Sequence, residues 1–400
     1  MMDYGKLLSP VVQEIKPSGI RKFFDIANTM KDVISLGVGE PDFPTPWEIR
    51  KAGILSLEAG KTRYTANRGL EQLREEISAW MKRKYGVEYD PATEILVTVG
   101  GSEAIDGALR AVVSPGDEVI IPQPSYVCYE PLVRMAGGVP VILETTAEHD
   151  FKVTPEMLRG ALSGRTKLLI LPYPCNPTGG VMERGDLEKI ADVLRGTNVL
   201  ILSDEIYSEL TFGGGRHVSV ASVPGMKERT VVVNGFSKTF SMTGWRMGFA
   251  CGPGELMKQI TKIHQFAIMC APTTAQYAAI EALRHGDDAV EAMREEYDMR
   301  RRLIVAGFNR LGLTCREPKG AFYAFPCIRS TGMTSDEFCE RLLYAERVAV
   351  VPGTAFGQGG EGFVRASYCY STDHIREALR RIERFLQTIH TQPDGAEETP

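Results

Sequence analysis

Residues 234 to 248 read N-G-F-S-K-T-F-S-M-T-G-W-R-M-G, and the rest of the chain is interpreted around this stretch. Lys238 lies between two hydroxyl residues, Ser237 and Thr239, and Arg246 follows shortly after. A lysine amine can condense with an aldehyde to form a Schiff base, which is how lysine serves in several cofactor enzymes. A serine and an arginine nearby can hold a phosphate. A lysine in such a loop is more often a solvated surface residue, so both interpretations stay open at this point.

Bulk composition limits the classes of function. The chain has 400 residues, 43% of them hydrophobic, and a formal net charge of −5. This length exceeds what one compact core usually holds, so we expect two domains. Charges of both signs are interspersed without a basic tract, so we expect neither nucleic acid nor a membrane surface as the main partner. No apolar run has the length of a transmembrane helix, and the start M-M-D-Y-G-K-L-L-S-P lacks the apolar core of a secretion signal.

The eight cysteines and six histidines are dispersed along the chain. No two cysteines form a C-x-x-C pair, and the histidines show no metal-ligand spacing, so we expect no metal site. In a large chain of this kind, scattered cysteines are most simply reduced thiols. We therefore expect a cytoplasmic protein.

Between residues 94 and 180, short apolar runs alternate with helical patterns, and apolar runs follow at 199 to 203 and 230 to 234, which predicts an α/β domain with a mostly parallel sheet. Polar groups follow several of these runs. Gly101 and Ser102 open a helix and offer backbone amides to an anion. Tyr126 and Asn176 follow later strands, at the edge where open α/β sheets bind ligands. Common turn chemistry explains these residues equally well when each is taken alone.

The apolar run V-L-I-L-S, residues 199 to 203, reads as a central parallel strand, and Asp204 and Tyr207 follow it. A carboxylate at the end of a buried strand is costly unless it meets a positive group. Asp204 is therefore either a helix cap or a partner for a cationic cofactor nitrogen. A similar run at residues 230 to 234 leads to Lys238.

Two further stretches carry candidate residues. In I-S-L-G-V-G-E-P-D-F-P-T-P, residues 34 to 46, Gly39 would let a ligand approach the backbone, although a rigid crossing between domains would also explain the prolines. In F-V-R-A-S, Arg365 has apolar residues on both sides. We expect it to be partly buried and to need an anion or a carboxylate as partner.

The regular alternation of strands and helices ends in the last part of the chain, which we expect to form a small α+β domain. We expect a short helix around residues 19 to 30 and a long helix at 287 to 311, followed by strands at 321 to 325, 348 to 351 and 363 to 367, and helices at 334 to 345 and 372 to 388. The expected domains are residues 1–45 as an arm and part of the small domain, 46–290 as the large domain, 291–388 as the small domain, and 389–400 as a disordered tail.

Seven motifs in order carry a resemblance to a known family: G-V-G-E-P-D-F, Y-T-A-N-R-G, V-G-G-S-E-A, P-C-N-P-T-G, S-D-E-I-Y, S-K-T-F-S-M-T-G-W-R-M-G and F-V-R-A-S-Y. The chain resembles the class I and II aminotransferases, which are fold-type I enzymes dependent on pyridoxal phosphate. The motifs S-G-I-R-K-F-F-D-I-A and G-A-F-Y-A-F-P are most similar to the archaeal aromatic aminotransferase subgroup. The resemblance implies a large domain with a mostly parallel seven-stranded sheet covered by helices, plus a smaller α+β domain.

The resemblance implies a role for each motif residue around the cofactor ring. Lys238 would hold pyridoxal phosphate as an internal aldimine, and Asp204 would bond the pyridine nitrogen. Tyr207 and Asn176 would bond the phenolic oxygen. Tyr126 would stack on the ring.

The resemblance also implies how the phosphate is bound. Gly101, Ser102, Ser237 and Arg246 would bind it within one subunit. Tyr64 would reach it from the neighbouring subunit, because such sites lie at the interface of a homodimer.

For the substrate, the resemblance implies that Arg365 clamps the α-carboxylate, helped by Gly39, Asn176 and Tyr126. The expected reaction moves an amino group from an L-amino acid, with aromatic donors as the first expectation, to 2-oxoglutarate. Tyr129 departs from the best-known aspartate enzymes, which carry a histidine there, behind the pyridine-binding aspartate.

Three alternatives remain at this stage. An aspartate or broad-specificity aminotransferase would use the same residues. A C–S β-lyase would share Lys238 and Asp204 and would release pyruvate and ammonia without a 2-oxo acid. A non-enzymatic sensor domain, of the kind found in some transcription regulators, would require a DNA-binding winged helix, for which the residues before Ile34 leave no room.

Overall fold

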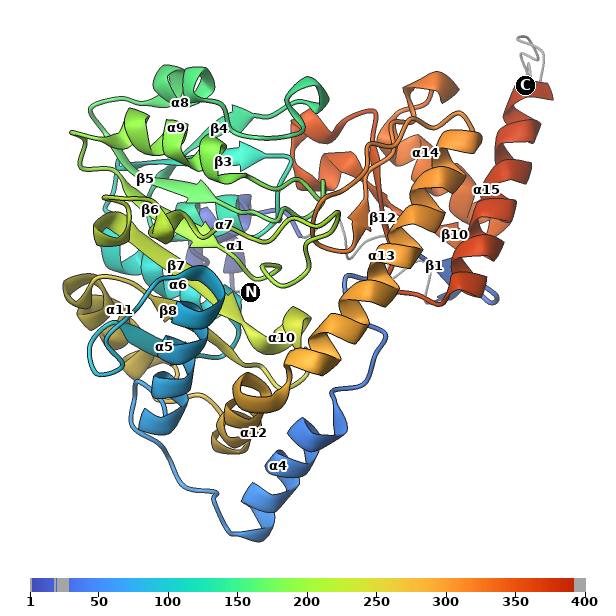
Figure 1. Cartoon of the computed structure of the whole chain (residues 1–400). Coiled ribbons are helices and arrows are strands. Elements are labelled where there is room, and N and C mark those ends of the chain that lie inside the picture. Colours follow the sequence, from blue (N-terminus) through green and yellow to red (C-terminus); the bar gives the residue numbers. More distant parts are fainter. Residues whose placement is uncertain (1, 18, 20–28, 392–400) are drawn as a thin grey trace.

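The computed structural model describes residues 2–17, 19 and 29–391, and it shows a large α/β part beside a smaller C-terminal part (Figure 1). The helix expected around residues 19 to 30 falls mostly outside the described residues, as does most of the expected tail. The last helix, α15, continues to Thr391. The expected domain boundaries stay a prediction, and the one after residue 290 falls within helix α13, Asp287–Arg310.

A seven-stranded sheet forms the centre of the large part. Its strands lie in the order β2-β8-β7-β6-β5-β3-β4. Their bounds are β2 Ile95–Thr98, β3 Glu118–Gln123, β4 Val139–Glu144, β5 Thr166–Leu171, β6 Leu200–Asp204, β7 Thr230–Gly235 and β8 Gly248–Cys251. Strand β8 is antiparallel to both of its neighbours, and the other pairs are parallel. The prediction of a mostly parallel sheet is confirmed.

The strands are apolar on both faces because helices cover both. In β5, Leu168 and Ile170 belong to the core beneath helices α6 and α11, whereas Leu169 and Leu171 belong to the core beneath α8 and α9. This alternation follows from the two-residue period of a strand. The helices of the large part are α4 Trp47–Glu58, α5 Glu71–Tyr85, α6 Gly101–Val112, α7 Tyr129–Met135, α8 Pro155–Ala161, α9 Arg184–Leu194, α10 Phe236–Thr239, α11 Gly254–Ala267 and α12 Thr273–His285.

The smaller part packs helices against short strands. Its helices are α13, α14 (Ser335–Glu346) and α15 (Thr372–Thr391), and its antiparallel sheet consists of β11 (Val351–Pro352), β12 (Val364–Ser367) and β9 (Tyr323–Ala324). The strand expected at 348 to 351 is two strands, because β10 (Val348–Ala349) pairs with β1 (Ile34–Ser35) and β11 pairs with β12. Segment 34–46 is thereby anchored to the C-terminal part.

The remaining short elements lie in the N-terminal arm and in the connections between the larger elements. Helices α1 Tyr4–Leu7 and α2 Pro10–Glu14 form the N-terminal arm. Short 3-10 helices lie at Ala147–His149, Val220–Ser222, Lys227–Arg229, Arg329–Thr331, Gly353–Phe356 and Gln358–Gly360. Among the described residues, no helix has the length and apolar character needed to cross a membrane.

Candidate active site

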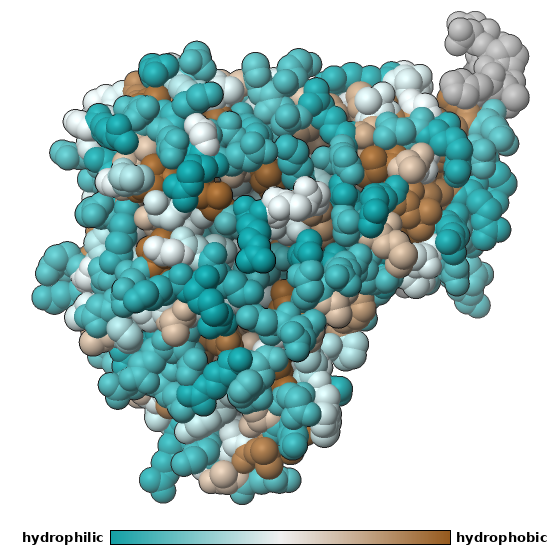
Figure 2. All heavy atoms as spheres, viewed as in Figure 1, coloured by the Kyte–Doolittle hydropathy of each residue, from teal (hydrophilic) through white to brown (hydrophobic). Residues whose placement is uncertain are grey.

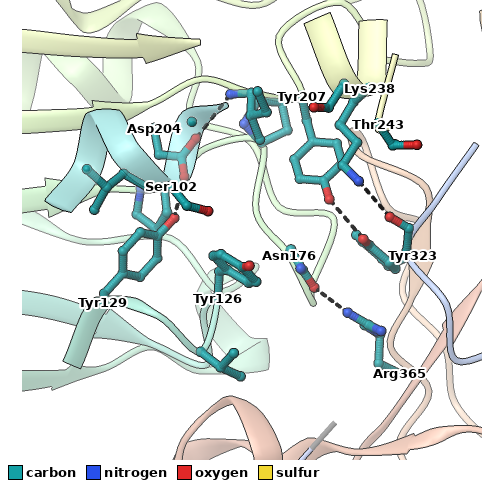
Figure 3. Close-up of a pocket in the computed structure, with 18 of the residues that line it drawn as sticks. Ser102, Tyr126, Tyr129, Asn176, Asp204, Tyr207, Lys238, Thr243, Tyr323 and Arg365 are labelled. Carbon is teal, nitrogen blue, oxygen red and sulfur yellow. Dashed lines mark hydrogen bonds between the residues drawn. The ribbon is translucent and has the colours of Figure 1, made fainter. Parts of the chain in front are cut away.

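A cavity of about 740 Å³ opens at the carboxyl ends of the parallel strands, between the two parts of the molecule. Figure 3 shows the side chains that point into it. Every predicted site residue except Tyr64 lines this cavity: Gly39, Gly101, Ser102, Tyr126, Asn176, Asp204, Tyr207, Ser237, Lys238, Arg246 and Arg365. Residues far apart in the sequence meet there because parallel strands deliver their carboxyl ends to one edge of the sheet.

Lys238 lies on the short helix α10, directly after β7, and its amine faces the cavity. The amine donates a hydrogen bond to the carbonyl of Gly39 at 2.7 Å. Burial lowers the pKa of Lys238 to about 8, and the positive charges of Arg365 and Arg246 act in the same direction. A substantial fraction of this amine is therefore neutral near pH 8 and able to act as a nucleophile or a base.

Asp204 ends strand β6 and is buried. Its carboxylate accepts a hydrogen bond from the Tyr129 hydroxyl at 2.7 Å and another from the backbone N–H of Ile206 at 3.2 Å. Burial raises the pKa of Asp204. In the part of the chain that the structure describes, no lysine, arginine or histidine forms an ion pair with it, and no α-helix begins there for it to cap. The carboxylate is thus suited to a positive group from a bound molecule.

The N-terminus of helix α6 forms one end of the cavity, where Gly101 and Ser102 present the first amides of the helix. Ser237 joins them from the start of α10. The guanidinium of Arg246 lies beside Gly100, where an added Cβ would be 2.5 Å from Nη2. Arg246 donates to the carbonyl of Thr243 at 3.0 Å, so its charge is not neutralised by that contact. Amides, hydroxyls and an arginine at a helix N-terminus form a binding site for an anion.

Arg365, on strand β12, is 2% exposed. It donates to the Asn176 side-chain oxygen at 2.9 Å and to the carbonyl of Gly37, and its Nε has no partner among the described residues. Its guanidinium lies over the rings of Tyr323 and Phe356, at 4.5 and 4.9 Å from their centres. Within residues 2–17, 19 and 29–391, no carboxylate pairs with it. A buried arginine without a carboxylate is a site prepared for an anionic ligand.

Aromatic residues enclose the space between these groups. The hydroxyl of Tyr207 lies 2.8 Å from the hydroxyl of Tyr323, and the ring of Tyr126 meets the edge of Tyr129 with 6.0 Å between centres. Tyr323 was not predicted as a site residue, because its motif served only to identify the subgroup. Tyr129 was noted for its position, and the structure adds its hydrogen bond to Asp204.

Tyr64 is the predicted site residue that does not lie in the cavity. Its side chain is 77% exposed, on the loop between α4 and α5. Within one chain, Tyr64 lies apart from the other site residues. A contact from Tyr64 to the site of a neighbouring subunit stays a prediction.

Comparison with known proteins gives a consistent family. The family model "Aminotransferase class I and II" matches residues 31–382. An aspartate aminotransferase of Pyrococcus abyssi is 47% identical over 93% of this chain and 96% of its own length. An aromatic-amino-acid aminotransferase of Thermococcus litoralis is 43% identical over 95% and 98% of the two chains. The crystal structure of an aromatic aminotransferase from Pyrococcus horikoshii superposes with a TM-score of 0.88 at 45% identity, covering 92% of this chain and 99% of that chain.

Proposed function

Because the chain belongs to the class I and II aminotransferases, we propose that it transfers the amino group of an aromatic L-amino acid to 2-oxoglutarate, with Lys238 as the residue that binds the cofactor. The chain is an aminotransferase, and its cofactor is pyridoxal phosphate. The roles of individual residues, the substrates and the assembly are the proposal.

The residues of the cavity fit this cofactor group by group. Pyridoxal phosphate carries an aldehyde, a ring nitrogen, a phenolic oxygen and a phosphate. The aldehyde needs an amine that can lose its proton, and Lys238 has a pKa lowered to about 8. The ring nitrogen needs a carboxylate, and Asp204 is buried and lacks a cationic partner in the described chain. Tyr207 and Asn176 would hold the phenolic oxygen.

The phosphate and the ring face have matching partners as well. Gly101, Ser102, Ser237 and Arg246 would hold the phosphate at the N-terminus of α6. Tyr126 lines the same space and would cover one face of the ring. All these side chains border one continuous cavity, so a single flat molecule can reach them together.

When bound, the cofactor supplies an electron sink that makes the Cα–H bond of an amino acid acidic. The chain's own residues do the remaining work. Asp204 holds a positive charge on the ring nitrogen, since a carboxylate stabilises the protonated form of a nearby base. Lys238 would move the proton from Cα to the carbon that carried the cofactor's aldehyde, which a lysine of ordinary pKa does poorly at neutral pH. Arg365 fixes the α-carboxylate and thereby sets which bond of Cα faces Lys238.

One observation carries this proposal. A lysine with a lowered pKa faces the same cavity as a buried arginine and a buried carboxylate, and among the residues that the structure describes the arginine has no carboxylate partner and the carboxylate has no cationic partner. An enzyme that acts on an α-amino acid needs a group that reacts at the amine and a cation that binds the carboxylate, a short distance apart. A structural ion-pair network would instead have paired Asp204 with Arg365 or another cation.

The cations of the cavity bear on the substrate. Among the described residues that line it, the cationic side chains are those of Lys238, Arg246 and Arg365. Each has a role with the cofactor or the α-carboxylate, so a second substrate carboxylate finds no cation in this lining. Because aspartate and 2-oxoglutarate both carry a second carboxylate, this lining does not separate an aromatic donor from aspartate, and the aromatic donor is supported by the similarity to the aromatic aminotransferases of Thermococcus litoralis and Pyrococcus horikoshii. The second carboxylate of 2-oxoglutarate then requires a group from outside this lining, for which the partner subunit of a dimer is the proposed source.

We predict that the purified holoenzyme forms phenylpyruvate and glutamate from L-phenylalanine and 2-oxoglutarate, with kcat/KM at least about tenfold higher than for L-aspartate. A donor panel of phenylalanine, tyrosine, tryptophan, aspartate and alanine measures the ratio. If aspartate were the only donor of the panel that yields glutamate, the aromatic donor would be contradicted and an aspartate aminotransferase supported. Pyruvate and ammonia released from cystathionine without a 2-oxo acid would instead support a β-lyase.

We further propose a homodimer in which Tyr64 of each subunit reaches the phosphate end of its partner's cavity. Tyr64 is largely exposed, and helix α4 exposes the apolar side chains of Trp47, Ile54, Leu55 and Leu57. Figure 2 shows hydrophobic atoms at the end of the molecule that α4 forms in Figure 1. Exposed apolar side chains gathered on one element mark an interface.

Subunit complementation tests this assembly. Tyr64→Ala and Lys238→Ala proteins are each expected to have little activity. Mixed dimers contain one site built from the intact Tyr64 of one chain and the intact Lys238 of the other. Co-expression should therefore restore about a quarter of the wild-type activity if the halves assort at random. No restoration in verified mixed dimers, or a monomer in sedimentation velocity, would contradict the proposal.

Two further expectations remain proposals. The cytoplasmic location is supported by the eight cysteines, all of which are free, since disulfides form readily in oxidising compartments. Cell fractionation tests it.

The domain bounds 1–45, 46–290 and 291–388 are supported by the grouping of strands into a seven-stranded sheet and a separate C-terminal sheet. Limited proteolysis tests them.

A further inference from the structure

The side chain of Tyr323, on strand β9, contacts groups that serve both the cofactor and the substrate in the proposed function. It is 1% exposed. Its hydroxyl lies 2.8 Å from that of Tyr207, and its ring lies under the guanidinium of Arg365 at 4.5 Å. Figure 3 shows Tyr323 between these two residues. One rigid side chain therefore connects the residue facing the phenolic oxygen of the cofactor with the residue facing the α-carboxylate.

The same hydroxyl also lies against Gly39. A Cβ added at Gly39 would be 2.0 Å from the Tyr323 oxygen, so a side chain at that position would displace the phenol. The carbonyl of Gly39 accepts the hydrogen bond from the Lys238 amine. The absence of a side chain at Gly39 thus allows the phenol to lie beside the backbone that holds the lysine.

Counting protons gives the hydrogen bond between the two tyrosines a direction. The two hydroxyls carry two protons, and one of these lies in the bond between them. If Tyr207 donates its proton to a phenolic oxygen in the cavity, it has none left for Tyr323. Tyr323 must then donate to Tyr207. A hydroxyl whose oxygen accepts a hydrogen bond is itself a stronger donor, because chains of hydrogen bonds polarise one another.

The ring of Tyr323 acts on Arg365 in a different way. Arg365 has no carboxylate partner among the described residues, so the faces of Tyr323 and Phe356 contribute to holding its charge before substrate arrives. A ring that stacks on the planar guanidinium also holds the orientation of its N–H groups. Loss of the ring would leave the guanidinium less well oriented, whereas loss of the hydroxyl alone would not.

We propose, on the basis of the proposed function, that Tyr323 is a positioning residue with two separable actions. Its hydroxyl donates to Tyr207 and thereby strengthens the hydrogen bond that Tyr207 makes to the cofactor's phenolic oxygen. Its ring supports Arg365 and thereby the binding of the substrate carboxylate. The hydroxyl sets the proton affinity of the bound cofactor, and the ring sets the affinity for the amino acid.

Tyr323→Phe and Tyr323→Leu separate the two actions. A stronger donor to the phenolic oxygen favours the deprotonated form of the bound cofactor, so Tyr323→Phe should raise the midpoint of the pH titration of visible absorbance by about half a pH unit or more. Its KM for the amino acid should stay within about twofold, because the ring remains. Tyr323→Leu should in addition raise KM about tenfold.

Tyr368→Phe is the matched control. Tyr368 is fully buried and its hydroxyl donates to the carbonyl of Ala321 at 3.1 Å, so the substitution also removes one buried hydroxyl. It should leave the titration midpoint unchanged. A Tyr207→Phe protein tests the chain directly: adding Tyr323→Phe to it should produce no further shift, because the relay through Tyr207 is already lost.

The outcomes are distinguishable. An unchanged midpoint in folded Tyr323→Phe, or an equal shift in Tyr368→Phe, would overturn the inference alone. Absence of visible absorbance in the wild-type holoenzyme would contradict the proposed function and the inference with it. If Tyr323→Phe does not fold, replacement of Tyr323 by 3,5-difluorotyrosine keeps the shape and makes the hydroxyl a stronger donor. The midpoint should then fall, and a rise or no change would overturn the inference.

Discussion

Replacing Lys238 with alanine is expected to abolish the visible absorbance that the imine between Lys238 and the cofactor gives the holoenzyme, and to lower kcat by about 10⁴-fold or more. In the proposed function, the substitution removes both the amine that binds the cofactor aldehyde and the base that moves the Cα proton. Lys238 is the lysine that lines the cavity in the described chain, so no second amine is placed to replace it. Absorbance spectra and single-turnover kinetics measure the two losses separately.

The control is Lys84→Ala. Lys84 is also largely buried, at 20% side-chain exposure, but its amine pairs with Glu209 and Asp287 away from the cavity. This variant should keep the spectrum and the activity. An unchanged spectrum in Lys238→Ala would show that another amine binds the cofactor. If Lys238 is the base, a small primary amine added to the buffer should restore part of the proton transfer in this variant.

The lowered pKa of Lys238 adds a pH dependence to the same prediction. Only the neutral amine attacks an aldehyde, and below the pKa each pH unit lowers the neutral fraction about tenfold. Since burial lowers the pKa to about 8, the rate of cofactor loading into the unliganded protein should rise from pH 6 to 8 and level off above pH 8. A rate that continues to rise to pH 10 would indicate a lysine of ordinary pKa.

The sequence was informative where local pattern determines structure. Apolar runs followed by turn residues predict the parallel strands, because a strand buried on both faces must be apolar throughout. The same logic places Asp204 and Lys238 at one edge of the sheet, and in the structure both residues line one cavity. The family motifs supplied the remaining candidates, and their individual roles stay a prediction.

Features that depend on distant pairing could not be predicted. Strand β8, Gly248–Cys251, is short and gains its partners from β2 and β7. The run at residues 348 to 351 looks like one strand, but its halves pair with different partners. Tyr323 contacts Tyr207 across 116 positions, and no local pattern distinguishes such a tyrosine from a core residue. Tertiary contacts, rather than propensity, decide all three.

Replacing Arg365 with leucine is expected to lower kcat/KM for the amino acid about 10³-fold while leaving the unliganded protein no less stable than the wild type. The loss of activity follows because the α-carboxylate loses its bidentate partner and the Cα–H bond its orientation. The stability follows because Arg365 is a buried charge without a carboxylate partner in the described chain, and we expect its desolvation cost to offset its two hydrogen bonds, to Asn176 and to the carbonyl of Gly37. An apolar side chain of similar length removes that desolvation cost.

Arg301→Leu is the matched control, because Arg301 is also buried but is paired. Its guanidinium bonds the carboxylates of Asp298 and Glu317, at 2.7 and 2.6 Å. Removing it breaks both contacts, and we expect a loss of about 1–2 kcal/mol in the free energy of unfolding with little change in kcat/KM. The two arginines should therefore show opposite patterns, with function lost at one position and stability lost at the other.

Arg365→Lys separates charge from geometry. Lysine keeps the positive charge but cannot form the planar fork, so binding should be partly restored while kcat stays low. Steady-state kinetics with L-phenylalanine and urea unfolding of the unliganded proteins give both quantities. Strong destabilisation by Arg365→Leu with unchanged KM would show that the guanidinium serves the fold. Arg365 would then stabilise the fold and not the bound substrate, because a charge kept for the substrate costs stability until the substrate arrives.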